Sequence, residues 1–298
     1  MNNRGPDFMI IGAMKCATST LHEQLSKHDH LFMSDPKEPN FFSNDEIYRK
    51  GWSWYSGLFS EAGDTDICGE SSTHYTKLPT YPKTIERIRA HLGTNIQFIY
   101  IVRHPIERLI SQYIHEWTQR EISVTIDEAI TRHPSLISYS LYSMQLKPFY
   151  QVFGASSVQL VFFERLVSEP QRVLETVCDF IGYKRTPNWD EGLEKQNASV
   201  QRLKRNAIRD AVIDLPGLKQ LRRRFVPQSI RDRIKDIWTM KERPALSSRS
   251  IGYLEEVFDE DLCTLGRWLD VDLTCDTFKD VARRIMPEIK VKERETET

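Results

Sequence analysis

A short apolar run followed by a loop rich in hydroxyl groups constrains the fold of this chain more than any other stretch. Phe8–Ile11 are four successive apolar residues, a pattern typical of a parallel strand buried on both faces. Gly12 then permits a tight turn, and the spacing of residues 18–25 predicts a helix with Thr18 in its first turn. Such a strand, loop and helix aim free backbone N–H groups at one point. The stretch therefore predicts an anion-binding loop, to which Lys15 adds a full charge.

This loop differs from the nucleotide-binding loop of ATPases and GTPases. That motif needs a Gly-Lys pair followed at once by Ser or Thr, whereas here Lys15 stands before Cys16, Ala17, Thr18, Ser19 and Thr20. A kinase would also need an acidic magnesium ligand after a second strand, but the next clear strand is followed by Arg103. The pattern favours a nucleotide bound by cations without a metal ion. The competing interpretation is a lysine and hydroxyls that only cap a helix.

Length and charge limit the class of protein. With 298 residues and 40% hydrophobic residues, the chain predicts a single α/β domain over residues 1–285, with a central parallel sheet flanked by helices. Residues 286–298 are rich in charge and are predicted to form a disordered tail. The net charge of −1 argues against a general nucleic-acid binder.

The cysteines and the apolar runs indicate a compartment. Five scattered cysteines without a CxxC pair argue against a disulfide framework and against a zinc site. No apolar run is long enough for a signal-peptide core or a membrane span. We therefore expect a soluble, cytoplasmic protein without a metal site.

A second strand and helix provide the next strong signal. Residues 96–102 predict a buried parallel strand, and Pro105 suits the first position of the helix that follows. Arg103 closes the strand at the edge where open α/β sheets bind ligands. Ser111 lies two turns into the helix, beside its apolar stripe, and can face the same crevice. A guanidinium and a hydroxyl there suit a phosphate monoester, unless Arg103 only holds the helix end and Ser111 faces solvent.

The long connection over residues 29–64 contains a candidate general base. Glu38 lies between Pro36 and Pro39, whose fixed φ angles stiffen the loop. We expect partial burial beside aromatic residues to raise the pKa of this carboxylate, as a general base needs. The alternative is a surface glutamate paired with Lys37. The aromatic residues of the same segment are either core or an acceptor pocket.

Two further segments carry polar residues of interest. Residues 67–75 predict a short strand that opens into a polar loop. We expect Glu70 to accept hydrogen bonds from backbone amides there. His74 either transfers protons, contacts an acceptor or has only a structural role. Residues 202–243 hold thirteen Lys or Arg and five Asp or Glu, which is a solvated helical face or a guide for an anionic acceptor or a membrane surface. Arg202 and Lys204 lie in a loop that can close over a ligand.

The rest of the chain continues the α/β pattern. We predict an amphipathic helix, a strand, a helix and a final amphipathic helix at residues 141–153, 158–163, 170–181 and 251–269.

Taken together, the motifs resemble those of the sulfotransferases that use 3′-phosphoadenosine 5′-phosphosulfate (PAPS), nearest to their bacterial and heparan-sulfate-type branches. Residues 12–19 resemble the 5′-phosphosulfate loop of that family, and residues 37–42 resemble the segment with its catalytic Glu. The 3′-phosphate motif is matched by Arg103, His104, Pro105, Arg108, Ser111 and Tyr113. Residues 163–170 and 179–182 also follow the family pattern, so the resemblance spans residues 7–275.

The resemblance implies a reaction and roles for residues. A sulfuryl group would pass from PAPS to a hydroxyl or amine of a saccharide, lipid or small metabolite by in-line displacement, leaving 3′,5′-adenosine diphosphate. Glu38 would take the acceptor's proton, Lys15 would neutralise the leaving oxygen, and His74 would contact the acceptor. The residues implied in binding the nucleotide are Lys15, Cys16, Ala17, Thr18, Ser19, Thr20, Arg103, Ser111, Arg202 and Lys204.

Two positions depart from the family pattern. Ala17 stands where the loop usually has Gly, which is compatible with close backbone approach if φ is negative. Ser71 stands where the heparan-sulfate enzymes often have Lys, which argues against a glycosaminoglycan acceptor. The competing functions are an ATP-dependent small-molecule kinase and a non-catalytic nucleotide-binding protein on the same fold.

Overall fold

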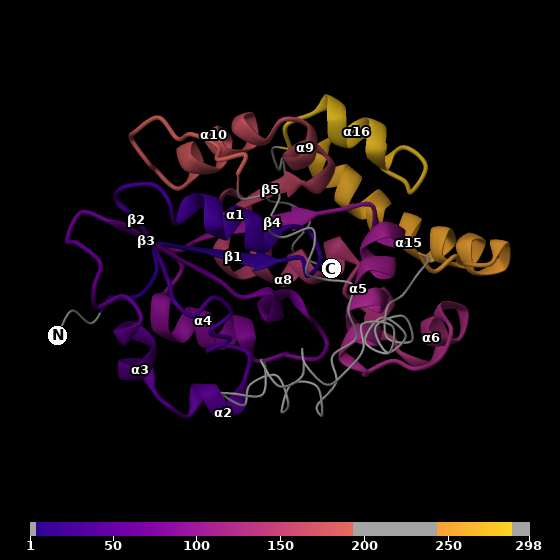
Figure 1. Ribbon diagram of the computed structural model, residues 1–298, viewed down its shortest axis with the longest axis horizontal. Coiled ribbons are helices and arrows are strands. Elements are labelled where there is room, and N and C mark those ends of the chain that lie inside the picture. The colour runs from indigo at the N-terminus through magenta and orange to yellow at the C-terminus, as the bar shows by residue number, and fades with distance from the viewer. Residues whose placement is uncertain (1–3, 193–242, 288–298) are drawn as a thin grey trace, which may run out of the picture.

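A parallel β-sheet forms the centre of the protein in the computed structural model, which describes residues 4–192 and 243–287 (Figure 1). Its strand order is β2-β3-β1-β4-β5, and every pairing is parallel. The strands are β1 (Phe8–Gly12), β2 (Leu31–Met33), β3 (Ile67–Ser71), β4 (Gln97–Val102) and β5 (Val158–Phe162). The predicted fold class is therefore confirmed.

Helices cover both faces of this sheet. In the view of Figure 1, α1, α9 and α10 lie above the sheet, and α4 and α8 lie below it. The described helical elements are α1 (Thr18–Leu25), α2 (Asp45–Tyr48), α3 (Trp52–Gly57), η1 (Thr73–Thr76), α4 (Thr84–Leu92), α5 (Pro105–Gln119), α6 (Ile126–Arg132), α7 (Ser135–Ser138), α8 (Tyr142–Phe153), η2 (Ala155–Ser157), α9 (Phe163–Ser168), α10 (Pro170–Phe180), α15 (Ser248–Leu269) and α16 (Phe278–Arg284).

Strand order places the predicted crevice. Because β1 lies between β3 and β4, Phe8 pairs with Gly69 on one side and with Gln97 on the other. The chain leaves β1 toward β2 and β3 on one side and later fills the other side with β4 and β5. The strand order thus reverses between β1 and β4, and their carboxyl ends lie side by side, which is where open α/β sheets bind ligands.

The connection between α1 and β3 differs from the prediction of one long loop. It contains the edge strand β2 and the short helices α2 and α3. A strand of three residues carries too little alternation to be recognised in a sequence. The aromatic rings of Phe41, Phe42 and Tyr55 are fully buried, and the rings of Phe41 and Tyr55 stack with centroids 4.6 Å apart. These three rings fill the core and line no acceptor pocket.

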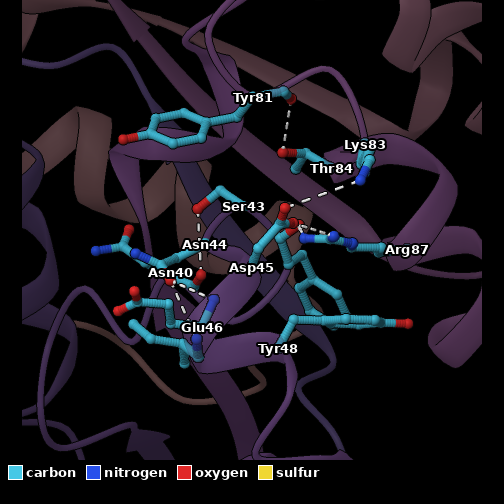
Figure 2. A network of polar contacts seen from close by, with 12 residues as sticks. Asn40, Ser43, Asn44, Asp45, Glu46, Tyr48, Tyr81, Lys83, Thr84 and Arg87 are labelled. Atoms are coloured by element: carbon cyan, nitrogen blue, oxygen red, sulfur yellow. Dashed lines mark hydrogen bonds and ion pairs between the residues drawn. The ribbon is translucent and has the colours of Figure 1, made fainter.

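A polar network fastens this connection to α4 (Figure 2). The Asp45 carboxylate pairs with the guanidinium of Arg87 and lies 3.8 Å from the ammonium of Lys83. Asn44 caps α2 by accepting hydrogen bonds from the N–H groups of Glu46 and Ile47, at 2.9 and 3.0 Å. The connection is therefore held on its outer side as well as by its buried rings.

The carboxyl-terminal part is only partly described. The helix predicted at residues 251–269 is α15, but α16 follows it. Arg202, Lys204, most of the basic segment 202–243 and all but two residues of the predicted tail lie outside the described residues. Among residues 4–192 and 243–287, no helix is long and apolar enough to cross a membrane, and no cluster of three acidic, His or Cys side chains could hold a metal ion.

Candidate active site

The loop after β1 is fixed by close contacts with its neighbours. A Cβ at Gly12 would lie 2.1 Å from the Thr76 hydroxyl oxygen and 2.7 Å from the Tyr100 ring, so no larger residue fits. One residue later, the Ala13 N–H donates to the carbonyl of Ile101 on β4 at 2.8 Å. The loop thus spans the gap between the ends of β1 and β4.

The first turn of α1 presents free N–H groups toward the loop. The first backbone bond of the helix runs from the Leu21 N–H to the Ala17 carbonyl at 3.1 Å, and no side chain caps the helix. The N–H groups of Thr18, Ser19 and Thr20 therefore have no partner within the helix. Together with the positive end of the helix dipole, they can bind an anion.

Two residues of the loop differ from expectation. Ala17 has φ = 62°, in the left-handed region, so the condition of a negative φ is not met and its methyl group imposes strain. The Cys16 side chain is fully buried, and burial raises the pKa of its thiol to about 12. Because the Cys16 N–H already donates to the Ala13 carbonyl at 3.2 Å, Cys16 shapes the loop from its core side.

Lys15 is a mostly buried cation. Burial lowers the pKa of its ammonium, and the nearby Arg103 guanidinium lowers it further. Within the described residues the ammonium makes neither a hydrogen bond nor an ion pair. Two positive groups held this close favour an anion between them.

Arg103 joins the loop at the end of β4. One guanidinium nitrogen, Nη1, donates to the Lys15 carbonyl at 3.4 Å, and the guanidinium carbon lies 4.6 Å from the centre of the Phe163 ring. The Tyr142 hydroxyl donates to the Arg103 carbonyl at 2.5 Å and fixes its backbone. The structure thus brings Lys15 and Arg103 together, as the sequence predicted.

Beyond Arg103, two further cations converge that the sequence reasoning missed. The Glu107 carboxylate lies 3.6 Å from Nη2 of Arg103 and 3.9 Å from the ammonium of Lys279, and it pairs directly with Arg243. Burial alone would raise the pKa of Glu107, but these cations together lower it. Ser111 lies one turn further along the same face of α5, half-buried, with no hydrogen-bond partner among the described residues. The local sequence gave no sign of this corner, because its cations come from distant segments.

Glu38 is ionised and anchored. The Lys37 ammonium lies 2.8 Å from its Oε1, and Thr73 donates to it from its backbone N–H at 2.9 Å and from its hydroxyl at 3.1 Å. Burial raises the pKa of Glu38, but the charge of Lys37 and these hydrogen bonds outweigh burial, so the net shift is downward. The predicted upward shift is therefore wrong, while the proposed pairing with Lys37 is correct.

The end of β3 holds Glu38 in place. The Glu38 N–H donates to the Ser71 carbonyl at 2.9 Å, and the Asn40 N–H donates to the Ser72 hydroxyl at 3.0 Å. Both Glu38 and Asn40 have positive φ angles, 60° and 53°. These long-range bonds impose the strained backbone, which explains why the local sequence did not reveal it.

Beneath this contact lies a buried carboxyl, that of Glu70. It is fully buried and bonds no backbone amide, contrary to expectation. Burial raises its pKa to about 8, opposed by the neighbouring hydroxyls of Tyr75 and Tyr55 and assisted by the charge of Glu38. Glu70 is thus largely protonated at neutral pH. Ser71, next along the strand, contacts Nδ1 of His22 through its hydroxyl at 2.8 Å.

His74 stands on η1, close to Glu38. Its ring stacks on Tyr81 with centroids 4.7 Å apart and planes 14° apart, and its buried Nδ1 has no hydrogen-bond partner in the described parts of the chain. Burial and the nearby Lys77 lower the pKa of His74 to about 4, although the Glu38 charge opposes this. A neutral imidazole of this kind can orient a ligand through hydrogen bonds, but it carries no positive charge at neutral pH.

Known proteins resemble this chain in sequence. Residues 5–262 match the family model described as Sulfotransferase domain. The chain is similar to mouse (Mus musculus) heparan sulfate glucosamine 3-O-sulfotransferase 3A1, with 32% identity over 192 residues that cover 60% of this chain and 46% of that protein. It is also similar to mouse heparan sulfate glucosamine 3-O-sulfotransferase 6, with 30% identity over 190 residues, 61% of this chain and 54% of that protein. The chain thus spans about half the length of these relatives.

A solved structure gives the same fold. The sulfotransferase from Alicyclobacillus acidocaldarius superimposes with a TM-score of 0.64 at 20% identity, over 91% of this chain and 98% of that one. At this identity the likeness concerns the fold alone.

Proposed function

The chain belongs to the sulfotransferase domain family, and from this premise we propose that it transfers a sulfuryl group from PAPS to a hydroxyl or amine of a saccharide acceptor. The names of the relatives, which specify glucosamine 3-O-sulfotransferases, support a saccharide over a lipid or a small metabolite. Membership of the family makes the protein a transferase. The donor, the acceptor and the roles of individual residues are the proposed part.

The groups at the ends of β1 and β4 support the proposal of a doubly phosphorylated nucleotide as donor. Lys15 and the free N–H groups of residues 18–20 suit the 5′-phosphosulfate, with the hydroxyls of Thr18 and Ser19. Arg103 and Ser111 suit the 3′-phosphate, and Arg202 and Lys204, outside the described residues, stay candidates for the same group. PAPS supplies the activated sulfuryl group, and no metal is required to hold it. Lys15 stabilises negative charge at the mouth of the loop.

Glu38 acts in this proposal as the general base. Its lowered pKa keeps it ionised at neutral pH, so it can accept the proton of an acceptor hydroxyl. Lys37 and Thr73 fix the direction of the carboxylate, at the cost of some basicity. Removing a positioned base of this kind costs about a hundred- to ten-thousand-fold in rate.

One observation carries the proposal: the guanidinium of Arg103 contacts the loop that contains Lys15, whose ammonium has no ion pair within residues 4–192 and 243–287. A sulfate-transfer assay with PAPS labelled in its sulfate, run across saccharide, lipid and phenolic acceptors, tests it. We expect labelled product and 3′,5′-adenosine diphosphate in equal amounts with at least one saccharide. Labelled product with none of the saccharides, or only with lipids or phenols, would contradict the proposed acceptor class.

The competing functions make different predictions for nucleotide binding. A kinase would be stabilised more by ATP with Mg²⁺ than by 3′,5′-adenosine diphosphate in a thermal-shift comparison, and we expect the reverse. A non-catalytic protein would bind the nucleotide without forming sulfated product. A cytoplasmic setting is also part of the proposal, supported by five cysteines that are all free thiols.

A further inference from the structure

One lysine beside Glu38 is used neither by the proposed donor site nor by the general base. Lys77 directly follows η1, which links the two halves of the site. At one end of η1, Thr73 donates to the Glu38 carboxylate; at the other, the Thr76 hydroxyl donates to the Ile11 carbonyl at 2.6 Å, where β1 ends. Lys77 therefore lies where the donor loop and the general base meet.

The ammonium of Lys77 has no strong partner. Within the described residues it makes no hydrogen bond or ion pair, and it lies 5.7 Å from the centre of the Tyr139 ring. Burial lowers its pKa, whereas the charges of Glu38, Glu116 and Glu121 oppose this without coming within ion-pairing distance. A mostly buried cation that has no ion pair within the described residues is costly unless a ligand pairs with it.

Aromatic rings surround this cation, and we name the group His74, Lys77, Tyr81 and Tyr139 the Lys77 platform. The partly exposed rings of His74 and Tyr81 stack on each other. The Tyr139 ring is largely buried and contacts the Thr80 hydroxyl through its own at 2.5 Å. The His74 and Tyr81 rings can pack against the apolar face of a sugar, and a cation beside them selects a charged substituent.

Hydrogen bonds make this platform rigid. The Tyr81 N–H donates to the Lys77 carbonyl at 3.2 Å, which closes the turn between them. The side chain of Gln145 on α8 accepts from the Leu78 N–H at 2.8 Å and donates to the Leu78 carbonyl at 2.9 Å. The Lys77 backbone is thus fixed from both sides, as a preformed binding site requires.

We propose that the Lys77 platform binds the acceptor through an anionic group on the sugar, a carboxylate or a sulfate ester, and so presents a neighbouring hydroxyl or amine to Glu38. This inference rests on the proposed function. The other nearby cations are engaged, because Lys37 pairs with Glu38 and because Lys15 and Arg103 face the donor crevice. Among the described cations near Glu38, Lys77 stays available for the acceptor.

A matched pair of acceptors tests the charge preference. One is a glucosamine–glucuronate disaccharide, and the other is the same disaccharide with its carboxylate reduced to an alcohol. For the wild type with PAPS, we expect the KM for the charged form to be at least about tenfold lower, a difference that one partly buried ion pair can supply. Binding in the presence of 3′,5′-adenosine diphosphate, followed by NMR, should show the same preference.

Three variants assign this preference to Lys77. Lys77→Met should abolish the preference for the charged acceptor, and Lys77→Arg should restore most of it. Lys83→Met is the matched control, since Lys83 lies nearby but is exposed and faces Asp45, and it should keep the preference. Equal KM values for both acceptors in the wild type, no saturable binding of the charged form, or an unchanged preference in Lys77→Met would each overturn the inference.

The affinity for the nucleotide separates this inference from the proposed function. Wild type and Lys77→Met should bind 3′,5′-adenosine diphosphate equally. If the wild type does not bind that nucleotide, the proposed function is wrong; if it binds but shows no charge preference, only the role of Lys77 is wrong.

Discussion

The two sides of the candidate active site are built in different ways. The proposed donor side, residues 13–20 with Arg103, consists of the ends of two adjacent central strands and the start of one helix. The proposed acceptor side, Glu38 with the Lys77 platform, consists of turns held by bonds to other segments. Glu38 and Asn40 even adopt positive φ angles there.

This difference explains how each side can vary. A site at the carboxyl ends of parallel strands is fixed by the sheet itself, so it suits the part of the reaction that the family shares. A site on anchored turns can change its side chains without disturbing the sheet, and therefore suits the part that differs between acceptors. We expect substitutions on one side to leave the other side's property intact.

We expect Glu38→Gln to produce the largest difference between its effect on turnover and its effect on nucleotide affinity. Turnover should fall by about a hundred- to ten-thousand-fold, because the general base is lost. The affinity for 3′,5′-adenosine diphosphate, measured by calorimetry, should stay within about twofold, because Glu38 lies on the acceptor side. Glu46→Gln, an exposed carboxyl on α2, is the matched control and should keep full turnover. Turnover retained in Glu38→Gln would remove Glu38 from its role.

Arg103→Ala makes the converse test on the donor side. Its affinity for 3′,5′-adenosine diphosphate should fall by about 1.5–3 kcal/mol, the range for a charge-assisted hydrogen bond. The affinity for adenosine 5′-monophosphate, which lacks the 3′-phosphate, should fall much less. Arg89→Ala, at an exposed arginine on α4, serves as the control. Equal losses for both nucleotides would contradict the assignment of Arg103 to the 3′-phosphate.

Glu70→Gln tests whether the buried carboxyl of Glu70 is protonated in the folded state, through the pH dependence of the protein's stability. The folded state holds the Glu70 proton up to a pKa of about 8, whereas the unfolded chain loses it near the ordinary value of 4.5. Because the unfolded state then binds fewer protons, this group makes the wild type less stable as pH rises from about 4.5 to 8. Gln carries no such proton, so the variant should gain stability relative to wild type over that interval.

Melting temperatures at pH 5 and pH 8 measure this effect. Between pH 5 and pH 8 we expect the stability of the variant relative to wild type to rise by a few kcal/mol, at most about 4 kcal/mol at about 1.4 kcal/mol per pH unit, or several degrees in melting temperature for a chain of this size. A difference between the variant and the wild type that does not change with pH would show that Glu70 is not protonated in the folded state.

The smallest effect is expected from Ala17→Gly on the donor side. Glycine adopts the left-handed backbone of this position without steric cost, so the variant should be more stable by about 0.5–1 kcal/mol. Ala13→Gly is the contrasting control, since Ala13 is buried and lacks a positive φ, and it should lose stability. Destabilisation by Ala17→Gly, measured by thermal unfolding, would contradict the strain at Ala17.

The difference between the donor side and the acceptor side also explains which features could be predicted from the sequence. On the donor side the apolar runs at β1 and β4 and the prolines and hydroxyls after them act locally, so the convergence of Lys15 and Arg103 was predictable. On the acceptor side Glu38 and its pairing with Lys37 were predicted from the neighbouring sequence, and the charge of Lys37 is the largest cause that lowers the pKa of Glu38. The hydrogen bonds from Thr73, which is 35 residues away, add to this shift and were not predictable from local sequence. Arg243 reaches Glu107 across 136 residues, and no local pattern encodes such a contact.

The crevice itself is tested most directly by binding 3′,5′-adenosine diphosphate to the wild-type protein in the presence of EDTA, followed by a crystal structure of the complex. The account predicts metal-independent binding, with the 5′-phosphate against residues 15–20 and the 3′-phosphate against Arg103. Absence of binding, or a nucleotide that leaves Lys15 and Arg103 without contact, would contradict it.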